Sequence, residues 1–226
     1  FLMWPLMAFG WVINVIQRGM ASMHRMNELL DSQPEDSGMA GGNADPVAEG
    51  SVTFSNLSFG FGDETVLHDI SFELKAGRTL AIIGPTGSGK STLLNLISRM
   101  YDPPPGTIFI DGRDVCSMPL KTLRAAIGVV PQETLLFSRT IGENIAYGNP
   151  DASDEEIQAA SEVSQIRAEI EEFPNGFDTM VGERGVTLSG GQKQRTAISR
   201  AVITDPQILV LDDALSSVDT YTEEEI

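Results

Sequence analysis

The chain has 226 residues, of which 41% are hydrophobic and 21% charged, so it is long and apolar enough to form one sizeable domain with an appendage. Its formal net charge of -17 disfavours a nucleic-acid partner, because proteins that bind phosphate backbones present a basic face, and a solvated acidic surface is the simpler explanation. The single cysteine, Cys116, excludes an intrachain disulfide, and the two histidines, His24 and His68, are too few and too scattered to suggest a metal cluster.

Residues 1–31 read as the end of a transmembrane helix with a cytosolic extension. Residues 1–16 are largely apolar, and the basic residues Arg18, His24 and Arg25 follow them, as is typical of the cytoplasmic end of a span. Sixteen helical residues cover about 24 Å, less than the ~30 Å of a bilayer core, so we expect the helix to begin before this chain does. A buried core helix remains an alternative. A signal peptide is disfavoured because its charges would precede the apolar stretch.

A linker and an α/β domain follow. Small, polar and helix-breaking residues dominate 32–50, which places a domain boundary there. The alternation of strand-like and helix-like segments after it favours an α/β sheet over residues 51–226. We expect strands at 52–61, 79–83, 107–110, 127–130 and 208–211, and helices at 91–100, from Ser153 with a Ser153–Glu156 capping box, and at 193–202.

A phosphate-binding loop is the strongest chemical signal. The run Gly84-Pro85-Thr86-Gly87-Ser88-Gly89-Lys90-Ser91 fits G-x-x-x-x-G-K-[ST], and a chance match in this length is on the order of one per cent. Its glycines let backbone N–H groups converge on an anion, to which the following helix adds its partial positive charge. Lys90 would reach the β- and γ-phosphates, and the Ser91 hydroxyl would bind Mg²⁺.

Two further segments carry polar groups suited to nucleotide chemistry. Asp212 ends the buried strand 208–211, where a carboxylate could hold Mg²⁺ beside the phosphate loop. Leu188-Ser189-Gly190-Gly191-Gln192 precedes a helical stretch, which predicts a second anion site at a helix N-terminus. A nucleotide bound to another subunit would explain why one chain carries two such sites.

These motifs, in this order, resemble those of the ABC transporter ATPases. Gly84–Ser91 looks like their Walker A loop, Leu188–Gln192 their signature and Ile208–Asp212 their Walker B strand. Gln132 resembles the Q-loop glutamine, Ser216–Asp219 the D-loop, and Val181–Gly185 a segment typical of exporters. The resemblance covers essentially the whole chain, with residues 1–31 similar to the end of an exporter's sixth membrane helix. It implies a P-loop NTPase core of the RecA-like type, with an antiparallel β subdomain and an α-helical signature subdomain.

The resemblance also implies roles and partners. In that family two such domains enclose two ATP molecules, each between the Walker motifs of one domain and the signature of the other. The residues that bind the nucleotide would be Phe61, Gly84 to Ser91, Thr92, Gln132 and Ser189 to Gln192. Mg²⁺ would be held by Ser91, Gln132 and Asp212. The catalytic residues would be Asp213 and Gln132. The implied partners are a second exporter half, identical or different, and the chain's own transmembrane domain, with this domain on the cytoplasmic side of the membrane. The substrate, a drug, lipid or peptide-like molecule, is not identified by the sequence.

The sequence departs from the family pattern at three points. Asp213 stands where a catalytic Glu is usual, as in the weakened half of a heterodimeric exporter, although an adjusted backbone would let Asp213 work. Phe61 stands where a Tyr often stacks on adenine, and plain core is its alternative role. The family's switch histidine and final strands are expected beyond Ile226.

Two other functions within the same family remain open. One is a soluble ABC-type ATPase acting on DNA or ribosomes, which the apolar residues 1–16, the exporter-like Val181–Gly185 and the acidic charge disfavour. The other is an ATP-dependent clamp in which Asp213 makes ATP binding, rather than turnover, the function. A GTPase is disfavoured because no Asn-Lys-x-Asp motif occurs.

Overall fold

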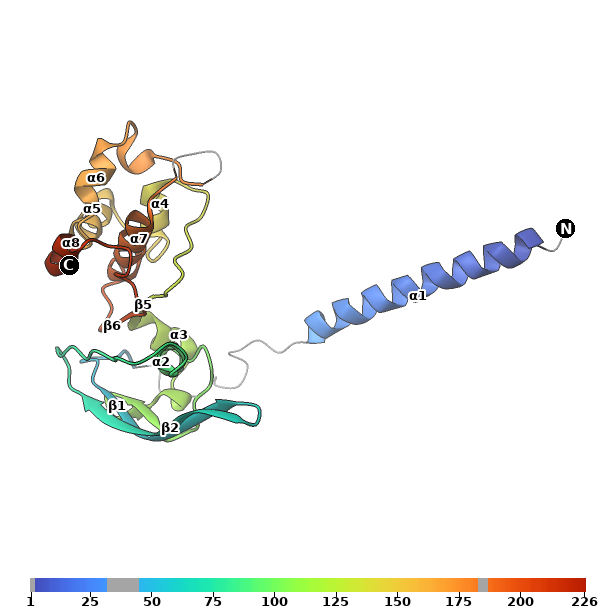
Figure 1. The fold of residues 1–226 in the computed structure, drawn as a ribbon, viewed down its shortest axis with the longest axis horizontal. Helices are drawn as coiled ribbons and strands as arrows, with labels where there is room; N and C mark the ends of the chain where they lie inside the picture. Colours follow the sequence, from blue (N-terminus) through green and yellow to red (C-terminus); the bar gives the residue numbers. More distant parts are fainter. Residues whose placement is uncertain (1–2, 32–44, 183–186) are drawn as a thin grey trace. The chain divides into compact units, whose positions relative to one another are not determined.

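A computed structural model describes residues 3–31, 45–182 and 187–226. Residues 3–31 form one compact unit, and the other described residues form a second. The first unit contains one helix, α1 (Met3–Asp31), so the expected continuation of the N-terminal helix through residue 30 is confirmed (Figure 1). Its large apolar side chains, among them Met20, Met23 and Met26, are exposed. In the part of the chain described, no helix has both the length and the apolar character needed to cross a membrane.

The second unit begins with an antiparallel sheet of four strands in the order β2-β1-β3-β4. Strands β1 (Val52–Phe61) and β2 (Glu64–Leu74) form a hairpin across a two-residue turn, and β3 (Ile108–Ile110) pairs with the other edge of β1 and with β4 (Arg113–Asp114). The predicted strand 52–61 is therefore confirmed at both ends. Strand β2, which the sequence reading missed, is signalled by the Gly62-Asp63 dipeptide, a typical hairpin turn.

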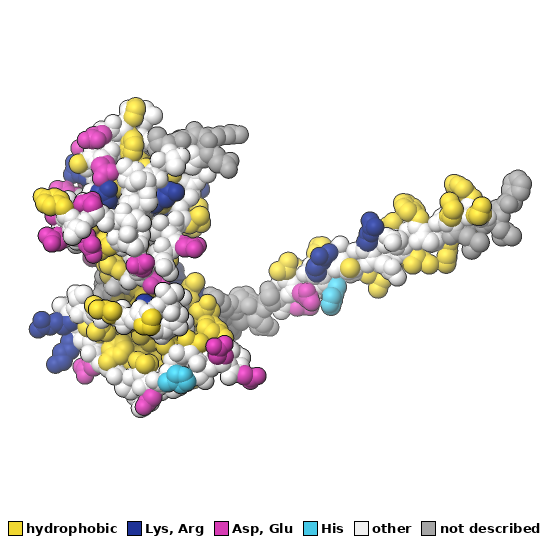
Figure 2. All heavy atoms as spheres, in the orientation of Figure 1, with side chains coloured by type: hydrophobic (Ala, Val, Ile, Leu, Met, Phe, Trp, Pro, Cys, Tyr) yellow, Lys and Arg dark blue, Asp and Glu magenta, His cyan; other side chains and the backbone are white. Residues whose placement is uncertain are grey.

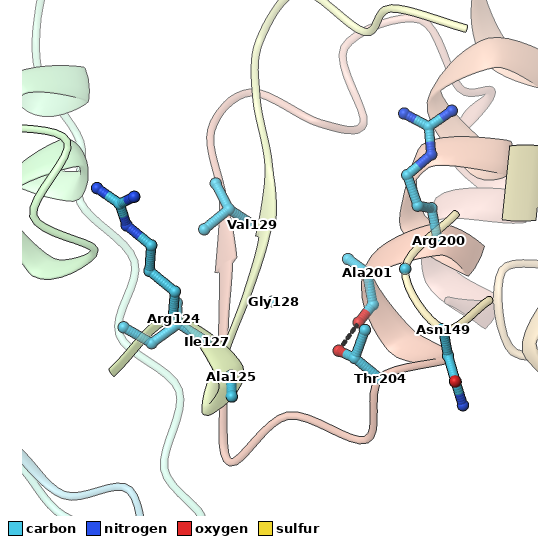
Figure 3. Close-up of a pocket in the computed structure, with 10 residues that line it drawn as sticks. Arg124, Ala125, Ile127, Gly128, Val129, Asn149, Arg200, Ala201 and Thr204 are labelled. Carbon is cyan, nitrogen blue, oxygen red and sulfur yellow. Dashed lines mark hydrogen bonds between the residues drawn. The ribbon is translucent and has the colours of Figure 1, made fainter. Parts of the chain in front are cut away.

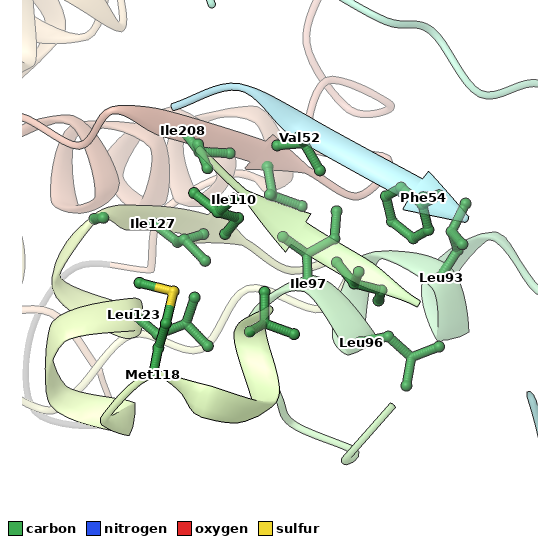
Figure 4. Close-up of a cluster of buried hydrophobic side chains, with 14 of the residues drawn as sticks. Val52, Phe54, Leu93, Leu96, Ile97, Ile110, Met118, Leu123, Ile127 and Ile208 are labelled. Carbon is green, nitrogen blue, oxygen red and sulfur yellow. The ribbon is translucent and has the colours of Figure 1, made fainter. Parts of the chain in front are cut away.

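One apolar core holds this sheet to the first helices. Figure 4 shows side chains of β1 and β3 packed with those of α2 (Lys90–Ile97) and α3 (Leu120–Ala125). Phe54, Leu96 and Leu123 are each at most 2% exposed, so most of their apolar area is removed from water. This packing fixes the direction in which α2 begins, and α2 begins in the phosphate loop.

A separate sheet consists of two parallel strands, β5 (Ile127–Val130) and β6 (Ile208–Leu211), paired in register from Ile127 opposite Ile208 to Val130 opposite Leu211. Both strands were predicted. Gly128 lets the segment that leads into β6 lie close to β5, because a Cβ there would lie 2.8 Å from Cγ of Pro206.

The strand predicted at 79–83 is wrong. These residues form no strand, and their apolar side chains are exposed, with Ile83 at 93%. An apolar strand of this kind is stable in the interior of a parallel sheet, where neighbouring strands pair with its backbone. Among the described residues no strand pairs with 79–83, so its backbone has no ladder to join.

The remaining helices form a helical part built around a second core of Ile141, Ile145, Ile166, Ile170 and Leu188 (Figure 1). Its helices are α4 (Ile141–Ala146), α5 (Asp154–Val163), α6 (Arg167–Glu172) and α7 (Gly190–Val202), and α8 (Thr220–Glu225) follows β6. Short 3-10 turns lie at Val115–Ser117 and Gly176–Asp178. The predicted capping box at Ser153 is confirmed, with both reciprocal hydrogen bonds to Glu156 present. Figure 2 shows Asp and Glu side chains scattered across this face of the helical part, as expected of a solvated acidic surface.

Candidate nucleotide-binding site

The phosphate loop has the backbone that an anion cradle requires. Gly87 and Gly89 adopt φ of +81° and +88°, a region that side chains with a Cβ rarely enter, and helix α2 begins directly after them at Lys90. A Cβ at Gly89 would lie 2.8 Å from Cδ2 of Leu67, so this glycine also lets the loop lie against β2. The Lys90 ammonium donates to the carbonyl oxygens of Gly84 and Pro85 at 2.9 Å each. The Lys90 side chain therefore folds back over the backbone of the phosphate loop.

The carboxyl ends of the parallel strands bring three other predicted residues together. Gln132 follows β5, and Asp212 and Asp213 follow β6, which ends opposite β5. The Asp212 N–H donates to the Val130 carbonyl at 3.0 Å, which continues the ladder by one bond. The Gln132 Nε2 donates to Asp213 Oδ2 at 3.4 Å, a long and weak hydrogen bond. Asp213 adopts φ of +51°, an uncommon conformation that turns this residue away from the strand direction.

Ser189 caps the helix of the signature-like segment. Its Oγ accepts from the Gln192 N–H at 3.2 Å, and Gln192 Oε1 accepts from the Ser189 N–H at 2.9 Å, so the two form a complete capping box at the start of α7. The hydroxyl that accepts this bond can still donate its own hydrogen. Gly190 and Gly191 lie against Ser217, and a Cβ at Gly191 would be 2.7 Å from the Ser217 carbonyl oxygen. Only glycine fits there without a backbone shift.

Gln194 is a residue that sequence reasoning missed. It lies on α7 and is 5% exposed, and its amide is bonded to the turn after β6. Its Oε1 accepts from the Ser217 N–H at 2.9 Å, and its Nε2 donates to Ser216 Oγ at 3.0 Å and to the Asp213 carbonyl at 3.5 Å. The helix that begins at Ser189 is thereby tied to the loop that carries Asp213. No local pattern signals this contact, because the two segments meet only in the folded chain.

Phe61, predicted to stack on the base, ends β1 and is 47% exposed. The alternative reading of Phe61 as plain core is therefore wrong. Its ring makes edge contacts with Phe59 and Tyr101, at centroid distances of 5.3 and 5.1 Å and interplanar angles of 86° and 83°. Edge-to-face contacts are a favourable arrangement for aromatic pairs, and the half-exposed Phe61 leaves part of its surface open to a ligand. Tyr101 was not anticipated as part of this cluster.

Some predicted residues are not brought together. Among the described residues, no hydrogen bond or ion pair joins the phosphate loop to Gln132, Asp212 or Asp213. Of the exporter-like segment 181–185, Val181 is buried and Gly182 has φ of +109°, and residues 183–185 lie outside the described ranges. A cavity of about 450 Å³ beside β5 and the end of α7 is lined by none of the predicted site residues (Figure 3).

The donor chemistry fits a magnesium nucleotide. Ser91, Gln132 and Asp212 offer a hydroxyl, an amide and one carboxylate, all oxygen donors of the kind Mg²⁺ prefers. Within residues 3–31, 45–182 and 187–226 no three His, Cys, Asp or Glu side chains gather into a cage. A few protein oxygens completed by phosphate oxygens and water are the usual arrangement for Mg²⁺ bound with a nucleotide.

A glycine loop at the start of a helix, a lysine folded over that loop and carboxylates after a parallel strand pair define a P-loop nucleotide-binding domain. A family model described as ABC transporter matches residues 67–216. The chain therefore belongs to the ABC transporter family, as the motifs indicated.

Named relatives show the branch of the family. The chain is 46% identical over 98% of its length to an ATM1-type heavy metal exporter of Novosphingobium aromaticivorans. It is 47% identical over 98% of its length to the probable multidrug resistance ABC transporter ATP-binding/permease protein YheI of Bacillus subtilis. A solved bacterial Atm1-family ABC exporter with ATP bound matches 98% of the chain at a TM-score of 0.84 and 46% identity. The predicted fold class and the resemblance to exporter-type ABC ATPases are confirmed.

The chain spans less than two fifths of the length of these relatives: 37% of the heavy metal exporter, 38% of YheI and 39% of the solved exporter chain.

Proposed function

We propose that this chain is the ATP-binding and ATP-hydrolysing part of an ABC exporter, which uses ATP-dependent pairing of two such domains to drive efflux. The observation that carries the proposal is the presence of two helix N-termini suited to phosphate in one domain. One is the phosphate loop 84–91, which leads into the first turn of α2, and the other is the start of α7, capped by Ser189. No described contact joins the two, so a second domain supplies the partner for each.

Each predicted residue has a role that its place supports. Lys90 leaves the carbonyls of Gly84 and Pro85 to meet the β- and γ-phosphates, and the half-exposed Phe61 stacks on the base. Ser91, Gln132 and Asp212 would hold Mg²⁺, which when bound neutralises charge on the β- and γ-phosphates. Asp213, beside Gln132, orients the attacking water. Thr92, on the first turn of α2, assists the phosphate contacts.

The same relatives support a place at a membrane. The name of YheI combines an ATP-binding and a permease part in one protein. By analogy, α1 with its basic residues would be the end of the last transmembrane helix of this protein. The ATPase domain would then lie on the cytoplasmic side, with a second exporter half as its partner. The names of the relatives specify heavy metal export and multidrug export. The acidic charge of this chain favours neither class of substrate.

The test uses the full-length transporter with Lys90→Ala and, as matched control, Lys121→Ala on the exposed start of α3. Both remove one lysine, but only the first removes the cation from the phosphate loop. Lys90→Ala should abolish ATP binding at this site by calorimetry, and Lys121→Ala should leave it unchanged. Unchanged ATP affinity in Lys90→Ala would overturn the proposal.

A second candidate function, a weakly hydrolysing half of a heterodimeric exporter, is favoured by one observation. Asp213, rather than a longer Glu, follows Asp212 and reaches Gln132 only through a 3.4 Å hydrogen bond. Its carboxylate would stand back from the attacking water, while the intact capped start of α7 would still serve the partner's ATP.

A further inference from the structure

The Glu169 carboxylate on α6 is bonded to two residues of α7. Its Oε2 accepts from Gln192 Nε2 at 2.8 Å, and its Oε1 accepts from a terminal guanidinium nitrogen of Arg195 at 2.5 Å. Glu169 is partly exposed, with 38% of its side chain in contact with solvent, whereas the Arg195 side chain is only 8% exposed. Three charged or amide groups thus meet just behind the start of the signature helix.

Gln192 is held at both ends of its amide. Its Oε1 accepts from the Ser189 N–H and its Nε2 donates to Glu169. A carboxylate has only acceptors, so the nitrogen of the amide must face Glu169 and the oxygen must face Ser189. Glu169 therefore selects the one amide orientation that completes the capping box and fixes Ser189.

Arg195 fixes Glu169 in turn. One terminal nitrogen of the guanidinium donates to the Gln165 carbonyl at 2.6 Å and the other to Glu169, while its Nε is buried without a hydrogen-bond partner. A guanidinium so poorly exposed needs a counter-charge nearby, and Glu169 is the carboxylate paired with it. The position of Glu169 is thus set by a buried cation rather than by solvent.

We infer that Glu169 is a positioning residue for the ATP held across the domain pair: through Gln192 it holds Ser189 and the start of α7 in the orientation that receives the partner domain's phosphates. This inference rests on the proposed function. The alternative is that Glu169 only holds α6 to α7, which would affect stability but not the signature.

An exchange of side chains separates the two. Glu169→Gln leaves a single side-chain oxygen to accept from two donors, Arg195 and Gln192. The charged Arg195 makes the stronger hydrogen bond to that oxygen, so the new amide nitrogen faces Nε2 of Gln192, and two donors oppose each other. Gln192→Glu sets two carboxylates against each other. The double exchange, Glu169→Gln with Gln192→Glu, restores a donor opposite an acceptor, and a capping box accepts Glu as well as Gln. Glu171→Gln is the matched control, because Glu171 lies on the same helix and pairs with Arg167 at the surface.

The measurements use the full-length transporter in its native pairing. Glu169→Gln should lower ATPase kcat about 10-fold, with ATP affinity at the phosphate loop changed less than 2-fold, and the double exchange should recover kcat to within about 3-fold. Glu171→Gln should leave kcat unchanged. Hydrogen exchange of the amides at 187–193 should quicken in Glu169→Gln and recover in the double exchange, which tests the placement even where activity is lost for other reasons.

Unchanged kcat and exchange in Glu169→Gln would overturn the inference, as would an equal loss in Glu171→Gln. A loss that the double exchange does not recover would also overturn it and assign Glu169 to stability alone. The proposed function fails separately, if Lys90→Ala keeps its ATP affinity whatever Glu169→Gln does.

Discussion

The length of the side chain at position 213 offers the sharpest test of how this domain hydrolyses ATP. Asp213 Oδ2 lies 3.4 Å from Gln132 Nε2, at the outer limit of a hydrogen bond. Asp213→Glu adds one methylene and carries the carboxylate about 1–1.5 Å further from the backbone. Misplacement by ~1 Å can cost ~10²-fold in rate, or about 2.7 kcal/mol of barrier.

If Asp213 marks a weakened site, Asp213→Glu should raise turnover at that site by up to about 10²-fold, and Asp213→Asn, of equal size but without the charge, should not. In a pair whose partner carries a Glu at the matching position, Asp213→Ala should reduce total turnover only modestly. Loss of the partner's Glu should reduce it by ~10²-fold or more. Ser189→Ala should reduce turnover more than Asp213→Ala, because Ser189 would serve the competent site.

Steady-state ATPase of the reconstituted full-length pair measures all these variants. If Asp213→Ala alone abolishes activity and Asp213→Glu gains nothing, Asp213 is the working residue. The domain would then be one half of a symmetric pair, and the shorter side chain of Asp213 would not limit its turnover.

Two further predictions concern groups outside the site. Burial alone would raise the pKa of Asp111, but the N–H groups of Glu49, Ser51, Gly50 and Ala48 hold that pKa at about 2. The ionised Asp111 therefore stabilises the fold above about pH 4, and this stabilisation is lost as pH falls through about 2. Asp111→Asn should lower the free energy of unfolding, measured in urea at pH 7, by about 1 kcal/mol after allowance for solvent screening, and by much less near pH 2. Equal stability of the two proteins at pH 7 would contradict this prediction. Burial and the Asp114 carboxylate raise the pKa of the Cys116 thiol to about 11, so only ~10⁻³ of it is thiolate at pH 8. Iodoacetamide should therefore label Cys116 slowly in the folded chain and faster in Asp114→Asn, as followed by mass spectrometry. Rapid labelling of the folded wild type at pH 8 would contradict a raised pKa of this thiol.

Local signals in the sequence predicted local structure well. Strand β1 runs from Val52 to Phe61 as its alternation indicated, and the Ser153–Glu156 pair caps α5, because both patterns depend on neighbours within a few residues. The apolar run 79–83 has the composition of a buried strand but forms none. Pairing depends on a neighbouring strand that composition does not reveal, so this prediction failed for a non-local reason.

The site divides in the same way. The phosphate loop, Asp212 and the start of α7 are contiguous motifs, and the sequence predicted their local positions before α2, after β6 and at the cap of α7. Their roles toward a nucleotide stay predictions. Gln194 and Glu169 were missed, because each acts across a gap in sequence, on the 213–217 turn and on α7 respectively. In the sequence alone, a buried glutamine on a helix cannot be told from a surface one.

Gln194 has one more consequence. Ser189 caps the start of helix α7, and Gln194, a little further along, is bonded to Ser216, Ser217 and the Asp213 carbonyl. A short helix moves as a unit, so a phosphate at Ser189, where we propose that one binds, would favour one arrangement of the turn that carries Asp213. In a closed pair of domains those two residues would face different ATP molecules. The binding free energies of the two nucleotides would then be coupled, and by thermodynamic reciprocity each would change the affinity of the other by the same factor. ATP titration of the pair should therefore depart from the curve for two independent sites.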